Sequence, residues 1–167
     1  MSINWKQFEL GVLRPTALKL HPFVRFDELP IRLVGETIWH ESDKLQALGQ
    51  YPRGGVTAEQ PFGPGLGPAS IEEPTWDWLH GIYRLLGREL GMGDRVFHYD
   101  ELAWNLALNV AGCRLRYFVD RRLLPTMESG VVGRSHYWFD VYNASGVESR
   151  RLKYIEDAGK IEWEIGL

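Results

Sequence analysis

The sequence has one cysteine, no long run of like charges and no paired histidines. Because Cys113 is the only cysteine, the chain can form neither an internal disulfide nor a cysteine-based metal cluster. His98 and His136 have no partner at metal-ligand spacing, so we expect neither a metal nor another cofactor. The 19 basic and 22 acidic residues give a formal net charge of -3, without the basic patch that nucleic-acid binding requires. We therefore expect no nucleic-acid partner.

Long apolar segments are also lacking. Lys6, Glu9, Arg14 and Lys19 interrupt the N-terminal region, which leaves no apolar run of signal-peptide length. No later segment is long enough to cross a bilayer, so we expect no membrane insertion. These absences predict a chain that is made in the cytoplasm and stays soluble unless something else carries it out.

What the chain has is a composition suited to one ordered domain. It contains 167 residues, of which 44% are hydrophobic and 13% aromatic, far from the composition of disordered chains. We expect a single domain over 1–167, mainly α-helical with little β structure. It divides into an N-terminal arm (1–26), a helical core (27–158) and a C-terminal tail (159–167).

Helical periodicity and proline or glycine punctuation define the core. Asp27 is placed to cap the first helix, and Pro125 to end the longest one. In the tail, Ile161, Trp163 and Ile165 alternate like a short strand, a plausible edge for strand addition to a neighbour. The predicted helices cover 28–42, 74–91, 100–122, 134–143 and 147–157.

A long loop rich in glycine and proline joins the first two helices. It runs from Gly49 to Ser70 and contains six glycines and four prolines. Loops of this length are uncommon in compact domains and are often functional. We expect this loop to line a cleft.

Glu41 is the first candidate for chemistry. It lies three residues after Ile38 and seven after Val34, on their apolar face, whereas Glu36 and Asp43 are turned away. Burial beside apolar groups raises a carboxyl pKa, as a general acid requires. The alternative is a helix-terminal glutamate bonded to the backbone of the next loop. His40 points off the apolar face, which favours exposure or a capping role.

Several short motifs occur in the order typical of one enzyme superfamily. They are Glu41-Ser42 at a helix end, Gly65-Leu66-Gly67 followed by Ser70, Ile71, Glu72 and Thr75, then Asn109-Val110-Ala111-Gly112, and Tyr142-Asn143-Ala144 before Gly146. Together they resemble the lysozyme-like superfamily, in particular soluble lytic transglycosylases and phage virion-associated muramidases. The resemblance spans about residues 27–158.

This resemblance implies a lysozyme-like fold and peptidoglycan as substrate. Glu41 would protonate the β-1,4 bond between N-acetylmuramic acid and N-acetylglucosamine. In a transglycosylase the same carboxylate then acts as a base on the muramic 6-hydroxyl. A hydrolase more often needs a second carboxylate, for which Glu72 and Glu73 are the nearest candidates, although charges favoured by the dipole at a helix start explain these two residues better. The implied substrate-binding residues are Ser42, Gly67, Ser70, Glu72, Tyr142 and Asn143.

The resemblance also implies a biological setting. Small proteins of this type without a signal peptide reach the cell wall inside a phage tail or baseplate, where other tail proteins are their partners. Family members usually carry an amide side chain near Ser70, whereas this chain has Pro68, Ala69 and Ser70. Three hypotheses stay open: a transglycosylase or muramidase, a structural tail protein with weak or lost activity, and a cytosolic helical binding module.

Overall fold

The computed structural model describes residues 3–46, 64–82, 96–143 and 146–164. Most of the glycine- and proline-rich loop predicted over 49–70 lies outside these ranges, as do the predicted helix end at Gly91 and the Ala144 of the last motif.

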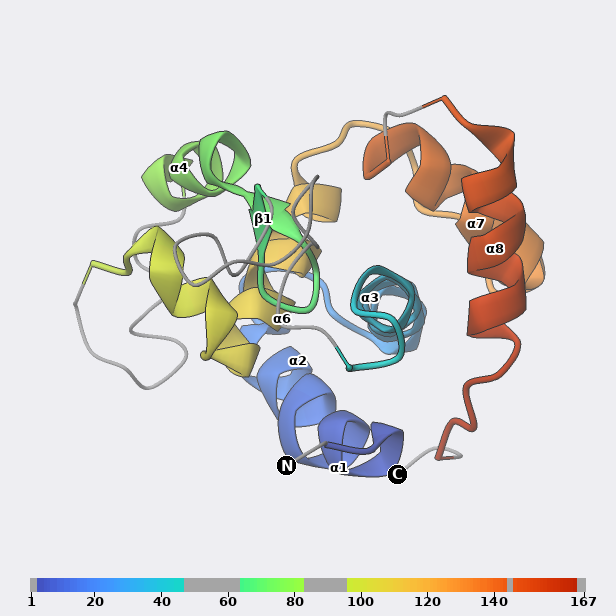
Figure 1. Ribbon diagram of the computed structural model, residues 1–167, viewed down its shortest axis with the longest axis horizontal. Coiled ribbons are helices and arrows are strands. Elements are labelled where there is room, and N and C mark those ends of the chain that lie inside the picture. Colours follow the sequence, from blue (N-terminus) through green and yellow to red (C-terminus); the bar gives the residue numbers. More distant parts are fainter. Residues whose placement is uncertain (1–2, 47–63, 83–95, 144–145, 165–167) are drawn as a thin grey trace.

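The described chain is mainly α-helical, which confirms the predicted class. Figure 1 shows α3 near the centre, α7 and α8 on one side, α4 and a small hairpin on the other, and α1 and α2 below. None of the helices described here has the length and hydropathy to span a bilayer. The elements are α1 (Trp5–Phe8), η1 (Glu9–Leu13), α2 (Arg14–Leu20), α3 (Glu28–Glu41), β1 (Gly65–Leu66), β2 (Ile71–Glu72), α4 (Glu73–Ile82), η2 (Tyr99–Ala103), α6 (Leu106–Phe118), α7 (Gly130–Val141) and α8 (Glu148–Ala158).

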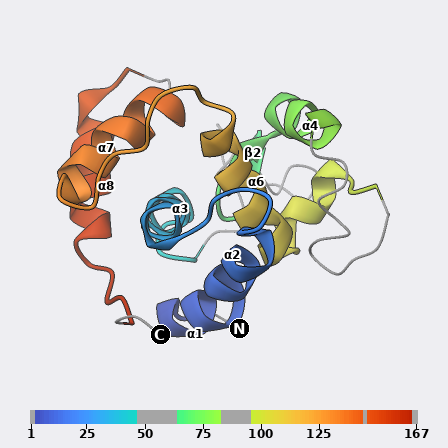
Figure 2. The same ribbon diagram turned by 180° about the vertical axis from the view of Figure 1, so that it is seen from behind.

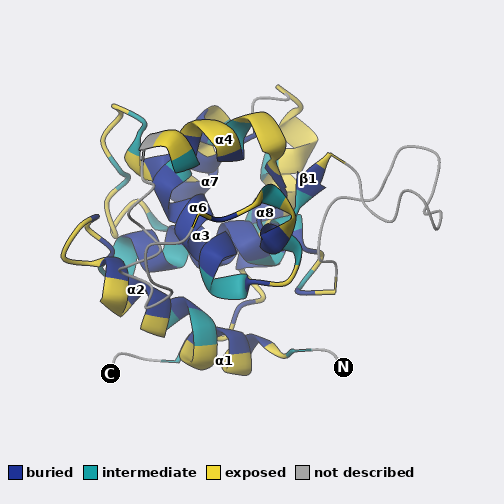
Figure 3. Ribbon diagram, turned by 90° about the vertical axis from the view of Figure 1, so that its left-hand side faces the viewer, coloured by how far each residue is buried: buried dark blue, intermediate teal, exposed yellow. Residues whose placement is uncertain are grey.

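Helix α3 is the core helix of the domain. The sequence predicted one buried face, but residues all round the helix are buried, as Figure 3 shows by its dark blue ribbon. Its contacts with η1, α6, α7 and α8 explain this, because neighbours cover every side. The prediction was therefore wrong for Glu36 and His40, which are both buried.

The N-terminal segment was predicted as an arm, and this too was wrong. Residues 5–20 form α1, the π-helical turn η1 and α2, and they contribute Phe8, Leu13 and Leu20 to the core. Figure 2 shows α2 packed beside α6. The helices of this segment were not predicted because they are short and because one of them departs from the 3.6-residue period. Apolar and charged residues also alternate along the segment.

The predicted helix over 100–122 is two elements. Asn105 separates η2 from α6, and its side chain accepts a hydrogen bond from the Leu108 backbone N–H at 3.1 Å, which starts a new helix. Helix α6 then ends at Phe118, well before Pro125. The apolar stripe is continuous across both elements, so periodicity alone could not reveal the break.

The other helix boundaries lie within a few residues of the predictions. Helix α7 begins four residues earlier than expected, at Gly130, and α8 agrees to within one residue. Asp27 occupies the N-cap position of α3 but makes no side-chain cap, because its Oδ2 accepts from Arg25 Nε at 2.5 Å.

The C-terminal tail is packed against the domain rather than extended as a strand. Trp163 lies edge-on to Trp5, with ring centroids 5.0 Å apart, and its indole approaches Gly35 so closely that a Cβ there would be 2.6 Å away. The backbone N–H of Glu164 donates to Glu9 Oε2 at 3.2 Å. Residues 161–164 therefore do not form the predicted strand. Ile165 lies outside the described residues.

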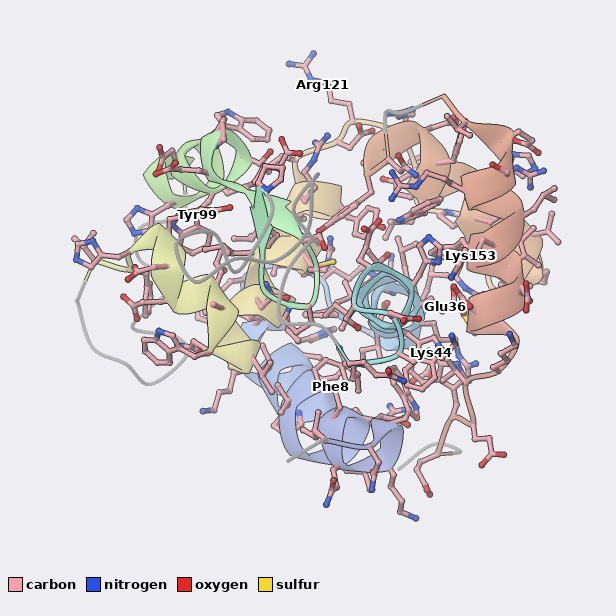
Figure 4. All side chains as sticks on the ribbon, viewed as in Figure 1. Phe8, Glu36, Lys44, Tyr99, Arg121 and Lys153 are labelled. Atoms are coloured by element: carbon pink, nitrogen blue, oxygen red, sulfur yellow. The ribbon has the colours of Figure 1, made fainter. Side chains whose placement is uncertain are left out.

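A buried ion pair ties α3 to the last two helices. Arg134 on α7 donates from Nη2 and Nε to the Glu36 carboxylate at 2.7 and 2.8 Å, and Tyr154 on α8 donates to the same group at 3.1 Å. Figure 4 labels Glu36 on the part of α3 that faces α8. Charged side chains survive burial when paired and hydrogen-bonded in this way.

The hairpin is short and antiparallel, with Gly65 opposite Glu72 and Leu66 opposite Ile71. Its turn requires glycine at position 67, where φ is +71° and a Cβ would collide with the Asn109 side chain and the Leu102 carbonyl. The turn is thus seated directly on η2 and α6.

We expect Gly67→Ala to destabilise the fold by about 3 kcal/mol, because strained φ and steric overlap add together. Gly130→Ala is the matched control: φ is +62° there, but a Cβ would meet nothing within 4 Å. The free energy of unfolding in urea measures both. Equal losses in the two variants would contradict the seating of the turn.

Glu36→Gln should lower the free energy of unfolding by about 3–5 kcal/mol, because it leaves the buried Arg134 guanidinium without its counter-charge. Asp120→Asn, which breaks an ion pair with the half-exposed Arg122, should cost much less because solvent screens that pair. Urea unfolding of both variants tests this, and similar losses would argue against the proposed anchoring role.

Candidate functional site

Glu41 is the last residue of α3, and its side chain is 8% exposed. The nearest opposite charge is Arg150 on α8, whose Nη2 lies 3.9 Å from Glu41 Oε2. This distance is too long for a hydrogen bond. The Glu41 carboxyl is thus buried without the strong pairing that Glu36 receives, so its neutral form is favoured.

Burial raises the pKa of Glu41 from 4.5 to about 7, and the charge of Arg150 and the indole N–H of Trp138 offset this only in part. Trp138 Nε1 makes no well-formed hydrogen bond in the described part of the chain, so its effect on the pKa of Glu41 is small. A carboxyl with a pKa near 7 can donate and accept a proton at neutral pH.

The backbone after Glu41 is held in an unusual conformation. The Ser42 hydroxyl donates to the Ile38 carbonyl at 2.5 Å and accepts from the Leu45 N–H at 2.8 Å. Asp43, Lys44 and Leu45 then all have positive φ values, between 46° and 64°. Left-handed conformations in non-glycine residues are strained and concentrate at functional sites. Ser42 therefore closes the helix end, and its hydroxyl is already engaged by the protein.

The hairpin turn presents a second strained segment. Ser70 has φ of +51°, and its buried hydroxyl has no hydrogen-bond partner within the described residues. Asn109 on α6 fixes this turn: its Oδ1 accepts from the Ala69 N–H at 2.8 Å, and its Nδ2 donates to the Leu66 carbonyl at 3.3 Å. The motif residue Asn109 therefore shapes the turn.

Tyr142, directly after α7, connects the hairpin to the surroundings of Glu41. Its hydroxyl donates to the Ala69 carbonyl at 2.5 Å. Burial raises its pKa well above 10, and the nearby charges of Cys113 and Glu41 add to the shift. Tyr142 thus links the hairpin turn to the end of α7, and it lies close enough to Glu41 for the two groups to affect each other electrostatically.

Asn143 and Arg150 complete this group. Asn143 is buried and accepts from Arg150 Nη1 at 3.4 Å, so one guanidinium lies between the Asn143 amide and the Glu41 carboxyl. Of the predicted site residues, Gly67 and Ser70 lie in the hairpin turn, and Tyr142 is hydrogen-bonded to that turn. Asn143 is connected to Glu41 through Arg150. Glu72 is exposed on β2 and is not part of this group.

His40 does not have the exposed or capping role that the sequence suggested. Its Nδ1 lies 2.8 Å from Asp157 Oδ2, and its ring lies edge-on to Trp138 with centroids 4.9 Å apart. Burial lowers its pKa, against the opposing effect of Asp157. Lys153, labelled in Figure 4, also donates to Asp157, at 2.8 Å. His40 thus belongs to a packed contact between α3 and α8.

Sequence reasoning missed Arg150, Trp138 and Tyr117 as neighbours of Glu41. The Tyr117 ring is tilted against that of Tyr142, with centroids 5.4 Å apart, and the Tyr117 hydroxyl shares a 2.6 Å hydrogen bond with Thr37. Thr37 precedes Glu41 by one helical turn, so helical spacing could have marked it. Nothing local in the sequence indicates that Arg150 faces Glu41.

A separate groove of about 810 Å³ lies between the α6 end and the segment after it. Part of its charged lining is paired within the protein, for example Asp120 with Arg122 and Asp27 with Arg25. It contains none of the predicted site residues. Glu41 therefore remains the stronger site for chemistry, because its proton affinity is perturbed.

The described residues contain no group of three or more histidine, cysteine, aspartate or glutamate side chains placed to hold a metal ion. Comparisons with protein-family models, curated proteins and solved structures found no match to this chain.

The pKa of Glu41 predicts a pH-dependent stability. Its folded-state pKa of about 7 exceeds the ordinary 4.5, so stability falls as pH rises through this window and is constant above it. The full loss is roughly 3 kcal/mol. Glu41→Gln should remove this dependence.

Urea unfolding of wild type and Glu41→Gln from pH 4 to pH 8 measures the effect. The stability of Glu41→Gln relative to wild type should increase by roughly 3 kcal/mol between about pH 4.5 and 7. A difference that stays constant across this range would show that Glu41 titrates normally.

Proposed function

We propose that this protein is a lysozyme-like, peptidoglycan-degrading protein in which Glu41 is the general acid and base. The observation that carries the proposal is a buried carboxyl with a pKa of about 7, at a helix end beside a strained hairpin turn and Tyr142. The order of motifs that resembles soluble lytic transglycosylases supports the same assignment.

The chemistry follows from the protonation state of Glu41. The protonated carboxyl donates to the glycosidic oxygen between N-acetylmuramic acid and N-acetylglucosamine, and the bond to the muramic C1 breaks. The carboxylate then accepts the proton of the muramic 6-hydroxyl, whose oxygen bonds to C1 and closes an anhydro ring. Glu41 is thereby protonated again, so one residue serves both steps.

We favour this transglycosylase route over a muramidase. Hydrolysis more often uses a second carboxylate at a defined distance across the scissile bond. In the described structure Arg150 is the charged side chain that acts most on Glu41, whereas Glu72 on β2 and Glu73 at the start of α4 are exposed. Among the described residues, Glu41 is the one carboxyl with a raised pKa, which supports the single-residue mechanism.

We further propose that the protein is carried in a phage tail or baseplate and acts on the periplasmic cell wall, with other tail proteins as partners. A structural tail protein with weak or lost activity is the second candidate. The observation that favours it is Ser70, which replaces the family's amide side chain and whose hydroxyl is buried without a partner in the described structure.

The test is cleavage of purified peptidoglycan, followed by turbidity and by mass spectrometry of the released fragments. Glu41→Gln should reduce the rate by about 10²–10⁴-fold, because glutamine cannot transfer the proton. Wild-type activity should fall as pH rises above about 7, where Glu41 loses its proton. Anhydro ends would identify a transglycosylase and reducing ends a muramidase.

Asp43→Asn is the matched control, since it changes an exposed carboxylate two residues away, and asparagine tolerates the left-handed backbone at this position. It should retain activity. If the wild type is folded by circular dichroism and yet leaves walls from several bacteria intact, the structural role is favoured instead.

A further inference from the structure

The protein binds Arg150 more weakly than it binds Arg134 or Arg122. Arg134 and Arg122 each hold a carboxylate at 2.7–3.0 Å through two nitrogens. Within the described residues, Arg150 has one side-chain hydrogen bond, to Asn143 at 3.4 Å, and one ion pair, to Glu41 at 3.9 Å. Both contacts are at the long end of their range.

The guanidinium of Arg150 is also accessible. Its side chain is 47% exposed, although it lies beside a carboxyl that is only 8% exposed. A guanidinium has five N–H donors in a planar fork, and carboxylates are the groups that fit this fork best. Arg150 is therefore accessible to a ligand while it lies beside the buried Glu41 carboxyl.

The position of Arg150 on α8 supports a role other than helix stability. It stands in the first turn, where the helix dipole disfavours a cation. The neighbouring Arg151 is instead paired with Glu148 and contacts Ser135 on α7. Arg150 receives no comparable compensation from its own helix.

We propose that Arg150 binds a carboxylate of the glycan next to the bond that Glu41 cleaves, so that the preferred substrate is an acidic rather than a neutral glycan. This inference rests on the proposed function. The carboxylate has two sources: the lactyl group of muramic acid in a peptide-free strand, and the stem peptide in an intact one.

Binding of the glycan carboxylate does not require Glu41 to move. The 3.9 Å separation leaves the Arg150 fork free to accept a second, stronger partner while Asn143 holds its Nη1 side. A substrate carboxylate on Arg150 would neutralise the charge that lowers the pKa of Glu41, which favours the protonated acid when substrate is present.

The test measures binding without cleavage, in the Glu41→Gln background, by isothermal titration calorimetry. The probes are peptide-bearing muropeptide oligomers, peptide-free oligomers with free lactyl carboxylates, and neutral chitotetraose. Arg150→Gln should weaken binding of a carboxylate-bearing probe about tenfold, which is about 1.4 kcal/mol, and change chitotetraose binding less than twofold. Arg150→Lys should restore part of the loss by keeping the charge.

Arg25→Gln is the matched control. It removes an exposed arginine of the same charge just before the opposite end of α3, and should leave all three affinities unchanged. The probe that loses affinity identifies the source of the carboxylate.

If Arg150→Gln leaves glycan binding intact, or weakens it equally for charged and neutral probes, the proposed role of Arg150 is wrong. The proposed function is unaffected by that result. If the Glu41→Gln protein binds none of the three probes, both proposals fall.

Discussion

The buried contact of Glu36 with Arg134 and Tyr154 is the interaction on which the rest of the structure depends. It fixes α3 against both α7 and α8 at the centre of the domain. A buried carboxylate with three donors has little freedom to shift, and mismatched helices would leave an unpaired charge. The contact therefore sets the register in which the three helices meet, and with it the position of the α3 end.

Glu41 lies five residues further along the same helix and has the opposite environment. Glu36 receives two guanidinium N–H groups and a phenol, whereas Glu41 has a single guanidinium at 3.9 Å. The well-paired carboxylate holds the helix, and the poorly paired one keeps its proton up to about pH 7. Anchoring by the first is what allows the second to stay buried without rearranging.

Much of the helical pattern could be predicted from the sequence, because apolar spacing and proline or glycine punctuation act locally. Helices α3 and α8 agree with the predictions within one residue. The sequence did not predict the break at Asn105, because an apolar stripe can continue across a helix cap. It also missed the helices before residue 20 and the packed tail, where the alternation near Trp163 fits packing as well as a strand. Tertiary contacts made those choices.

By itself the sequence determined a mainly helical chain with a carboxylate at the end of an apolar helix, because both properties follow from local spacing. It placed Glu41 among apolar residues but counted Glu36 and His40 as turned away. Only the tertiary structure decided that α3 is covered on all sides, that Glu36 is paired and Glu41 is not, and that Arg150 faces Glu41. Those outcomes depend on which helices surround α3, and no local pattern contains that information.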